Sequence, residues 1–78
     1  MRLILTTHAR ERMSERNITE DDVNKVLAGY VERVEGGASV RYKGVGATRN
    51  VMLKVWIVAK SDIPGKVKVV KSVAWEGE

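Results

Sequence analysis

The sequence of 78 residues has no cysteine, one histidine and one proline. Without cysteine there is no disulfide framework, and a reducing compartment suits the chain. With one histidine, no cysteine and scattered acidic residues, the chain also lacks the ligands of a transition-metal site. No stretch approaches the ~20 apolar residues of a membrane span, and Leu3–Leu5 is too short a run for a signal peptide. We therefore expect a cytoplasmic protein with no metal, no cofactor and no membrane contact.

A chain of this length makes one domain, residues 1–78, with a modest core. At such a size roughly 60–65% of the surface of the unfolded chain is removed from water on folding. A second copy would add burial, so a homodimer is an expectation of the length alone.

Positive charge is concentrated in the second half of the chain. The net charge is +4, and residues 38–75 carry eight Lys or Arg against one Asp. Such a surface attracts polyanions, nucleic acid first. The alternative is a generically basic, soluble surface, because lysines on exposed strands also discourage edge-to-edge pairing.

The hydropathy pattern predicts two helices followed by four strands. The first helix begins at Thr6 or Thr7 and ends at Asn17, which tolerates the left-handed conformation. The second begins at Thr19, with Asp22 as the capping-box partner, and stops at Gly29. Strands are predicted at 30–35, 38–43, 52–59 and 66–75. The fold class is α+β: two N-terminal helices packed on a four-stranded antiparallel sheet.

The sequence also indicates several shorter features around the predicted strands. Leu3–Leu5 is a short strand or an apolar arm, and 36–37 is a two-glycine hairpin turn. The segment 44–50 is a loop that could approach phosphate, although a bare Gly-x-Gly is a weak signal. In the last strand Lys71 breaks the alternation, which a β-bulge or an open end of the sheet would explain.

The first helix carries the most suggestive spacing. At about 100° per residue, His8, Arg12 and Arg16 lie at about 0°, 40° and 80° and form one seam. Guanidinium groups match phosphate oxygens, and histidine exchanges protons near neutral pH. The alternative is an ordinary solvated face on which Arg and Glu form weak pairs.

The residue inventory favours metal-independent chemistry on a phosphodiester. A Ser-His-Asp triad would need His8 with Ser72 or Ser14 and Asp62, and no nucleophile motif surrounds either serine. RNA supplies its own nucleophile, the 2′-OH, so an enzyme needs only proton-transfer groups and cations. One histidine with several Arg and Lys residues is sufficient for that.

The segment 6–23, continuing to Val26 and Leu27, resembles the opening of the small prokaryotic family called domain of unknown function 4258. The signature comprises a His-Ala pair at His8, an Arg-Met pair at Arg12, then Arg16. The resemblance implies a fold akin to the RelE and barnase-type ribonuclease toxins. Ser72 and Trp75 only approximate the hydroxyl and aromatic positions of the last strand, which leaves a second proton-transfer group unassigned.

Our first hypothesis is therefore a toxin-like ribonuclease. His8 acts as general base or acid, and Arg12 and Arg16 clamp the phosphate. Arg41, Lys54 or Lys71 bind nucleic acid from the sheet. The expected partners are RNA, including RNA on the ribosome, and an antitoxin protein docked at the open sheet edge.

The second hypothesis is a module that binds nucleic acid or protein without catalysis. Trp56 or Tyr42 would then stack on a base. For Trp56 we favour packing in the core, because aromatic residues supply much of the burial in a small protein.

Overall fold

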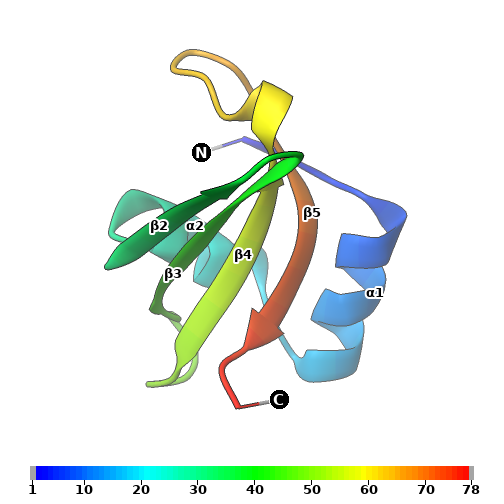
Figure 1. Cartoon of the computed structure of the whole chain (residues 1–78). Coiled ribbons are helices and arrows are strands. Elements are labelled where there is room, and N and C mark those ends of the chain that lie inside the picture. The colour runs from blue at the N-terminus through cyan, green and yellow to red at the C-terminus, as the bar shows by residue number, and fades with distance from the viewer. Residues whose placement is uncertain (1, 78) are drawn as a thin grey trace.

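The computed structural model describes residues 2–77 and shows an α+β fold with two helices. The five strands form one sheet in the order β1-β5-β4-β3-β2. In Figure 1, α2 lies behind the sheet and α1 stands beside β5. The elements in chain order are β1 (Leu3–Leu5), α1 (Thr7–Arg16), α2 (Glu20–Ala28), β2 (Glu32–Gly36), β3 (Ser39–Val45), β4 (Met52–Val58), the 3-10 turn η1 (Ala59–Ser61) and β5 (Lys68–Trp75).

The sheet is mixed, so the prediction of four antiparallel strands is wrong. β1 pairs with β5 in parallel, with Leu5 opposite Val70, whereas the other neighbouring strands are antiparallel. The pairing continues past β1, where Thr6 N donates to the carbonyl of Val70 at 3.2 Å. Three residues are too few to show a period, and the partner strand lies at the far end of the chain.

The helix ends agree with the predicted caps. The Thr6 hydroxyl accepts from Ala9 N, and Asn17 closes α1 in the left-handed conformation at φ 54° and ψ 48°. Thr19 and Asp22 form both bonds of the capping box of α2, and Gly29 is its C-cap. Local chemistry alone therefore fixes where both helices begin and end.

Alternate residues of β3, β4 and β5 face α2 and form the core. The side chains of Leu53, Val55 and Ile57 are fully buried, as the strand pattern predicts. The helices add the complementary apolar side chains. Core residues from outside β4 are Ala9, Met13, Ile18, Val23, Val26, Leu27, Val40, Tyr42, Val70, Val73 and Trp75.

β5 contains the predicted bulge at Lys71, and this bulge reverses the expected faces. Trp56 lies opposite Ser72 and Ile57 lies opposite Val70, so Lys71 is the extra residue. Val73 and Trp75 after the bulge are buried as predicted, but before it the buried residue is Val70. A single inserted residue changes the phase of the alternation, which a strict period of two does not anticipate.

The turns are tight, with small shifts from their predicted positions. The hairpin pairs Gly36 with Ser39, so the turn residues are Gly37 and Ala38 rather than the two glycines. At the same end of the sheet, between β4 and β5, Lys66 N donates to Ile63 O at 3.1 Å. Gly65 has a φ of 83°, as a type II turn after proline requires.

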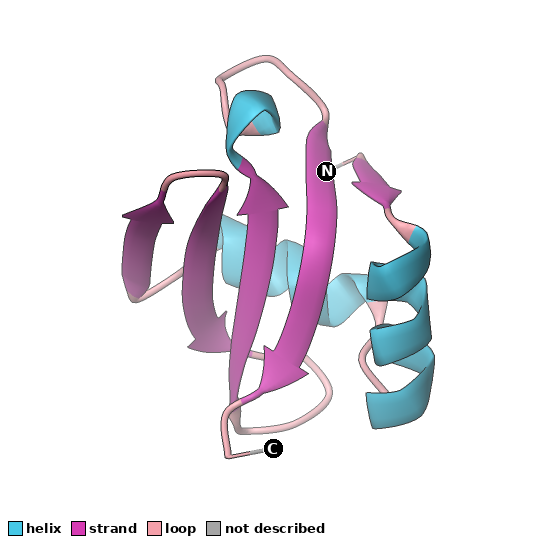
Figure 2. Ribbon diagram, turned by 45° about the vertical axis from the view of Figure 1, so that its right-hand side comes forward, coloured by secondary structure: helices cyan, strands magenta, loops and turns pink. Residues whose placement is uncertain are grey.

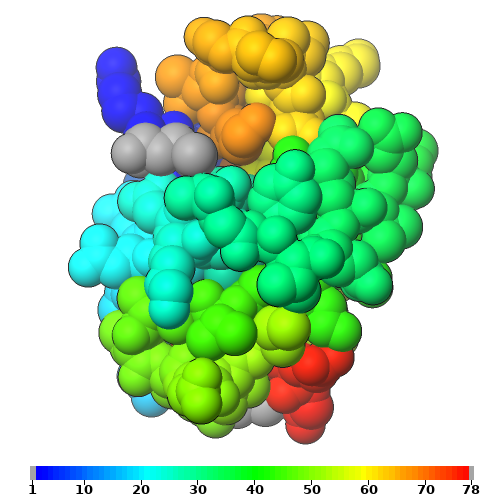
Figure 3. Space-filling view, turned by 90° about the vertical axis from the view of Figure 1, so that its left-hand side faces the viewer, coloured from blue at the N-terminus to red at the C-terminus, as the bar shows by residue number. Residues whose placement is uncertain are grey.

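The loop from Gly46 to Val51 is fixed by a buried carboxylate on α2. Asp22 Oδ1 accepts from the backbone N–H groups of Ala47 and Thr48, both at 2.7 Å, and from the Thr48 hydroxyl at 3.0 Å. A Cβ at Gly46 would lie 2.7 Å from the ring of Trp75. Figure 3 shows this segment (lime) packed directly against α2 (cyan). The amides that could have received a phosphate are thus occupied by Asp22.

We expect Asp22→Ala to lower the free energy of unfolding by about 3 kcal/mol, because it removes the acceptor of the backbone N–H groups of Thr19, Ala47 and Thr48. Urea unfolding followed by tryptophan fluorescence measures the loss. Asp21→Ala is the matched control, since Asp21 is exposed in the same helical turn and its change should stay within about 0.5 kcal/mol. Equal losses in the two variants would contradict the role given to Asp22.

Candidate nucleic-acid interface

The face of the sheet opposite α2 is uncovered: no described helix crosses it (Figure 2). Strand alternation places on it the side chains that do not enter the core, and these are half-exposed along β3 and β4. We call this surface the open face. Its central residues are Val34, Ser39, Arg41, Lys43, Lys54, Trp56 and Ser72.

Trp56 occupies the middle of the open face, so our expectation that it packs in the core is wrong. It lies directly opposite Arg41 on β3 and Ser72 on β5. The other tryptophan, Trp75, is fully buried and fills the core instead. Tyr42 is also buried, and its hydroxyl is hydrogen-bonded to Asp62, so it presents no ring for stacking.

Two hollows adjoin the indole of Trp56. The first, of about 270 Å³, is lined by Val34, Gly36, Ser39, Arg41 and Trp56. The second, of about 330 Å³, is lined by Ser39, Trp56, Lys71 and Ser72. Because Trp56 and Ser39 line both, the hollows are neighbours on one continuous surface.

Two cations of the open face carry a carboxylate partner. Arg41 Nη2 lies 2.5 Å from Glu32 Oε1, and Lys43 Nζ lies 2.5 Å from Glu76 Oε1. The hydrogen bond from Lys43 holds the pKa of Glu76 below its ordinary value. Within residues 2–77, Lys54 and Lys71 form no ion pair. The predicted nucleic-acid-binding residues Arg41 and Lys54 therefore share one face, and Lys71 borders it at the bulge.

The predicted catalytic residues lie along α1, beside β5 and apart from the centre of the open face. His8 is exposed in the first turn, and Arg16 is partly buried in the last. Arg12 forms an exposed ion pair with Glu15 at 3.1 Å. The Thr6 hydroxyl donates to the carbonyl of Lys71 at 3.1 Å. This bond fixes the start of α1, two residues before His8, against the bulge that lines the second hollow.

A family model described as Domain of unknown function (DUF4258) matches residues 5–74. The chain belongs to this family. Searches of curated proteins and of solved structures each find no match.

None of the helices in the described part of this DUF4258 chain is long and apolar enough to cross a membrane. Residues 2–77 contain no group of three or more His, Cys, Asp or Glu side chains placed to hold a metal ion.

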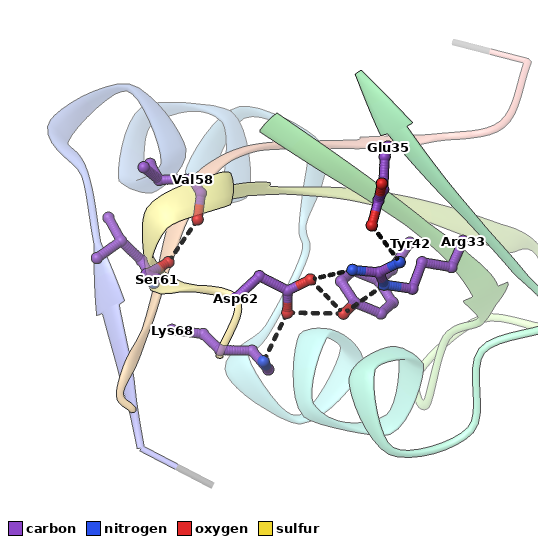
Figure 4. Close-up of polar contacts among 8 residues, drawn as sticks. Arg33, Glu35, Tyr42, Val58, Ser61, Asp62 and Lys68 are labelled. Atoms are coloured by element: carbon purple, nitrogen blue, oxygen red, sulfur yellow. Dashed lines mark hydrogen bonds and ion pairs between the residues drawn. The ribbon is translucent and has the colours of Figure 1, made fainter. Parts of the chain in front are cut away.

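The structure also shows a cluster of charged residues that the sequence analysis missed (Figure 4). Asp62 accepts from Tyr42 Oη at 2.7 Å, from Arg33 Nη2 at 2.8 Å and from Lys68 Nζ at 2.7 Å. These residues come from β2, β3, β5 and the segment after η1, so no local motif links them. The observed register brings Arg33 opposite Tyr42, whereas a turn at the two glycines would have brought it opposite Val40, so the predicted hairpin gave no signal of this cluster.

The Asp62 cluster stabilises the fold, and its carboxylate is not free to orient His8. The Asp62 side chain is only 4% exposed. Burial alone would raise its pKa, but the bonds from Lys68, Tyr42 and Arg33 outweigh burial and lower the pKa from 3.8 to about 2. Burial and the adjacent Asp62 raise the pKa of the Tyr42 hydroxyl. Both oxygens of the carboxylate are therefore committed to holding β2 and β5 together.

We expect the Asp62 cluster to contribute acid-sensitive stability of this DUF4258 chain. Because the folded-state pKa is depressed, the contribution is complete above about pH 5 and is lost as the pH falls from about 4 toward 2. The loss should amount to about 2 kcal/mol. Urea unfolding at a series of pH values measures it in the wild type and in Asp62→Asn, in which the acid limb should flatten. An acid limb of unchanged steepness in the variant would assign the loss to other carboxylates.

Proposed function

We propose that this chain binds single-stranded RNA on the open face of its sheet. The observation that supports the proposal is Trp56, a partly exposed indole at the centre of an uncovered sheet with cations around it. A large aromatic ring is costly to leave in water in a protein with so small a core. Stacking with an unpaired base removes it from water, and any base offers a suitable surface.

The cations of the open face suit a phosphate backbone. Arg41 lies opposite Trp56, and Lys43 lies opposite Lys54 on the neighbouring strand. Positive charges on both sides of a stacking platform are the usual arrangement for single strands. The carboxylates on Arg41 and Lys43 are about half exposed, at 46% each. Such exposed pairs are weak, so a phosphate can replace them at little cost.

We expect Lys54→Gln to weaken binding of a labelled single-stranded RNA and to reduce the slope of log affinity against log salt by about 0.7, because one phosphate contact is lost. Fluorescence anisotropy at several salt concentrations measures both quantities. Lys66→Gln removes the same charge from the exposed loop that carries Pro64 and is the matched control. It should leave the slope unchanged.

Equal slopes in the two lysine variants would show that the attraction is diffuse and that the open face has no defined phosphate position. Absence of any RNA binding by the wild type at low salt would refute the function itself.

Cleavage of the bound RNA is a second candidate function, of the kind carried out by the toxin-like ribonucleases. It is favoured by the bond from Thr6, two residues before His8, to the carbonyl of Lys71, a residue that lines the second hollow. His8 would remove the proton of the 2′-OH, whose oxygen attacks phosphorus. The bond from phosphorus to the 5′-oxygen breaks, that oxygen takes a proton from water, and a 2′,3′-cyclic phosphate remains.

An inhibitor of such an enzyme would have a place to dock. All five residues of β2 are exposed, and β3 lies on one side of the strand only. We propose that an antitoxin strand would add to the free edge by backbone hydrogen bonds.

For the cleavage candidate, we expect His8→Ala to lower the rate by about 10²- to 10⁴-fold, the usual contribution of one proton-transfer group. The assay uses single-stranded RNA with excess chelator and identifies the product ends. Arg10→Gln is the control, because Arg10 is exposed on the opposite side of α1. Product with cyclic phosphate ends at an unchanged rate in His8→Ala would exclude His8. Binding without scission by the wild type would leave the binding function alone.

A further inference from the structure

We propose that the open face accommodates two consecutive nucleotides, one base in each hollow, with the indole of Trp56 between them. This inference rests on the proposed RNA-binding function and specifies its ligand as a dinucleotide step of a single strand. The geometric basis is the pair of adjacent hollows of about 270 and 330 Å³ that share Trp56 and Ser39.

The two hollows have similar volume but different linings. The first has an apolar part, formed by Val34 and Gly36, and a guanidinium at Arg41. The second is lined by Lys71 and Ser72 in addition to the shared pair. Small side chains at Gly36, Ser39 and Ser72 leave the space beside the indole empty. In each hollow a planar ring can therefore lie against Trp56.

Hydrogen-bonding groups for the edges of the bases are available in this region. Among the described residues, no hydrogen bond engages the side-chain hydroxyl of Ser39 or of Ser72. A hydroxyl can donate or accept, so either group can pair with the polar edge of a base. Arg41 Nε is buried and also has no partner within residues 2–77. Because a buried donor without a partner is costly, this position favours a ligand with a hydrogen-bond acceptor.

Each of the two hollows is lined by one cationic side chain. Arg41 is on β3 and Lys71 is on β5, with β4 and Trp56 between them. At the usual spacing of strands the backbones of these two residues are about 10 Å apart, a separation that an extended dinucleotide can bridge. An RNA strand running across β3, β4 and β5 would then place a phosphate near each cation.

The first test is a titration of the whole chain with uridine oligonucleotides of one, two, three and six residues, followed by tryptophan fluorescence. Of the two tryptophans, Trp75 is 0% exposed, so quenching reports on Trp56. We expect affinity to rise about 5- to 150-fold from the mononucleotide to the dinucleotide, the factor that one added base stack supplies. Each further residue should add less. In Trp56→Leu, which lacks the reporter and is therefore followed by the fluorescence anisotropy of labelled oligonucleotides alongside the wild type, the first step should disappear.

Two filling variants separate the hollows. Gly36→Leu occupies the first, and a Cβ there meets Ser39 O at an ordinary 3.5 Å. Ser72→Leu occupies the second from the half-exposed face of β5. Each should reduce dinucleotide affinity to that of the mononucleotide, while the hexanucleotide still binds in a salt-dependent way. Circular dichroism and thermal unfolding confirm that both variants fold.

The outcomes distinguish this inference from the function on which it rests. If the hexanucleotide binds but affinity shows no step at the dinucleotide, or if only one filling variant has an effect, the two-base arrangement is wrong and RNA binding stands. If no oligonucleotide binds at low salt, the proposed function fails and this inference fails with it.

Discussion

The fold depends on the contacts of one buried indole, that of Trp75. Its Nε1 donates to the carbonyl of Arg16 at 2.8 Å, which ties the last turn of α1 to β5. Gly46 lies against the ring, and the Arg49 guanidinium stacks over it at 4.8 Å from the centroid. The same loop is held on its other side by Asp22. Helix α1, the loop before β4 and the end of the sheet are therefore fixed around a single side chain.

Trp75 fills the core, and the other tryptophan lies on the open face. Both helices contribute apolar residues to one side of the sheet, and two short helices provide little to cover the other side. β4 accordingly buries Leu53, Val55 and Ile57 and presents Trp56 outward. The alternation along β4 already separated Trp56 from these residues. The general tendency of small proteins to bury aromatic rings was a weaker guide than this local period.

Features encoded by neighbouring residues were predictable from the sequence, and features encoded by distant residues were not. The caps at Thr6 and Thr19 and the turn at Gly65 each depend on a few adjacent residues, and all appear in the structure. The parallel pairing of β1 and the cluster around Asp62 join segments far apart in the chain. The bulge at Lys71 was visible only as a break in the pattern, because its effect on the faces depends on the pairing with β4.

The sequence predicted charged residues of the candidate interface but not the shape of its surface. Arg41 and Lys54 were named for their charge, while the hollows beside Trp56 come from small side chains on three strands. The arrangement of two of these charges does not favour the stability of the sheet. Lys43 and Lys54 lie directly opposite each other, and like charges in that position destabilise a sheet. Glu76 offsets the repulsion through its pair with Lys43. Conflicts between local preference and the fold are expected at functional surfaces, and a phosphate between these lysines would relieve this one more fully than a single exposed carboxylate.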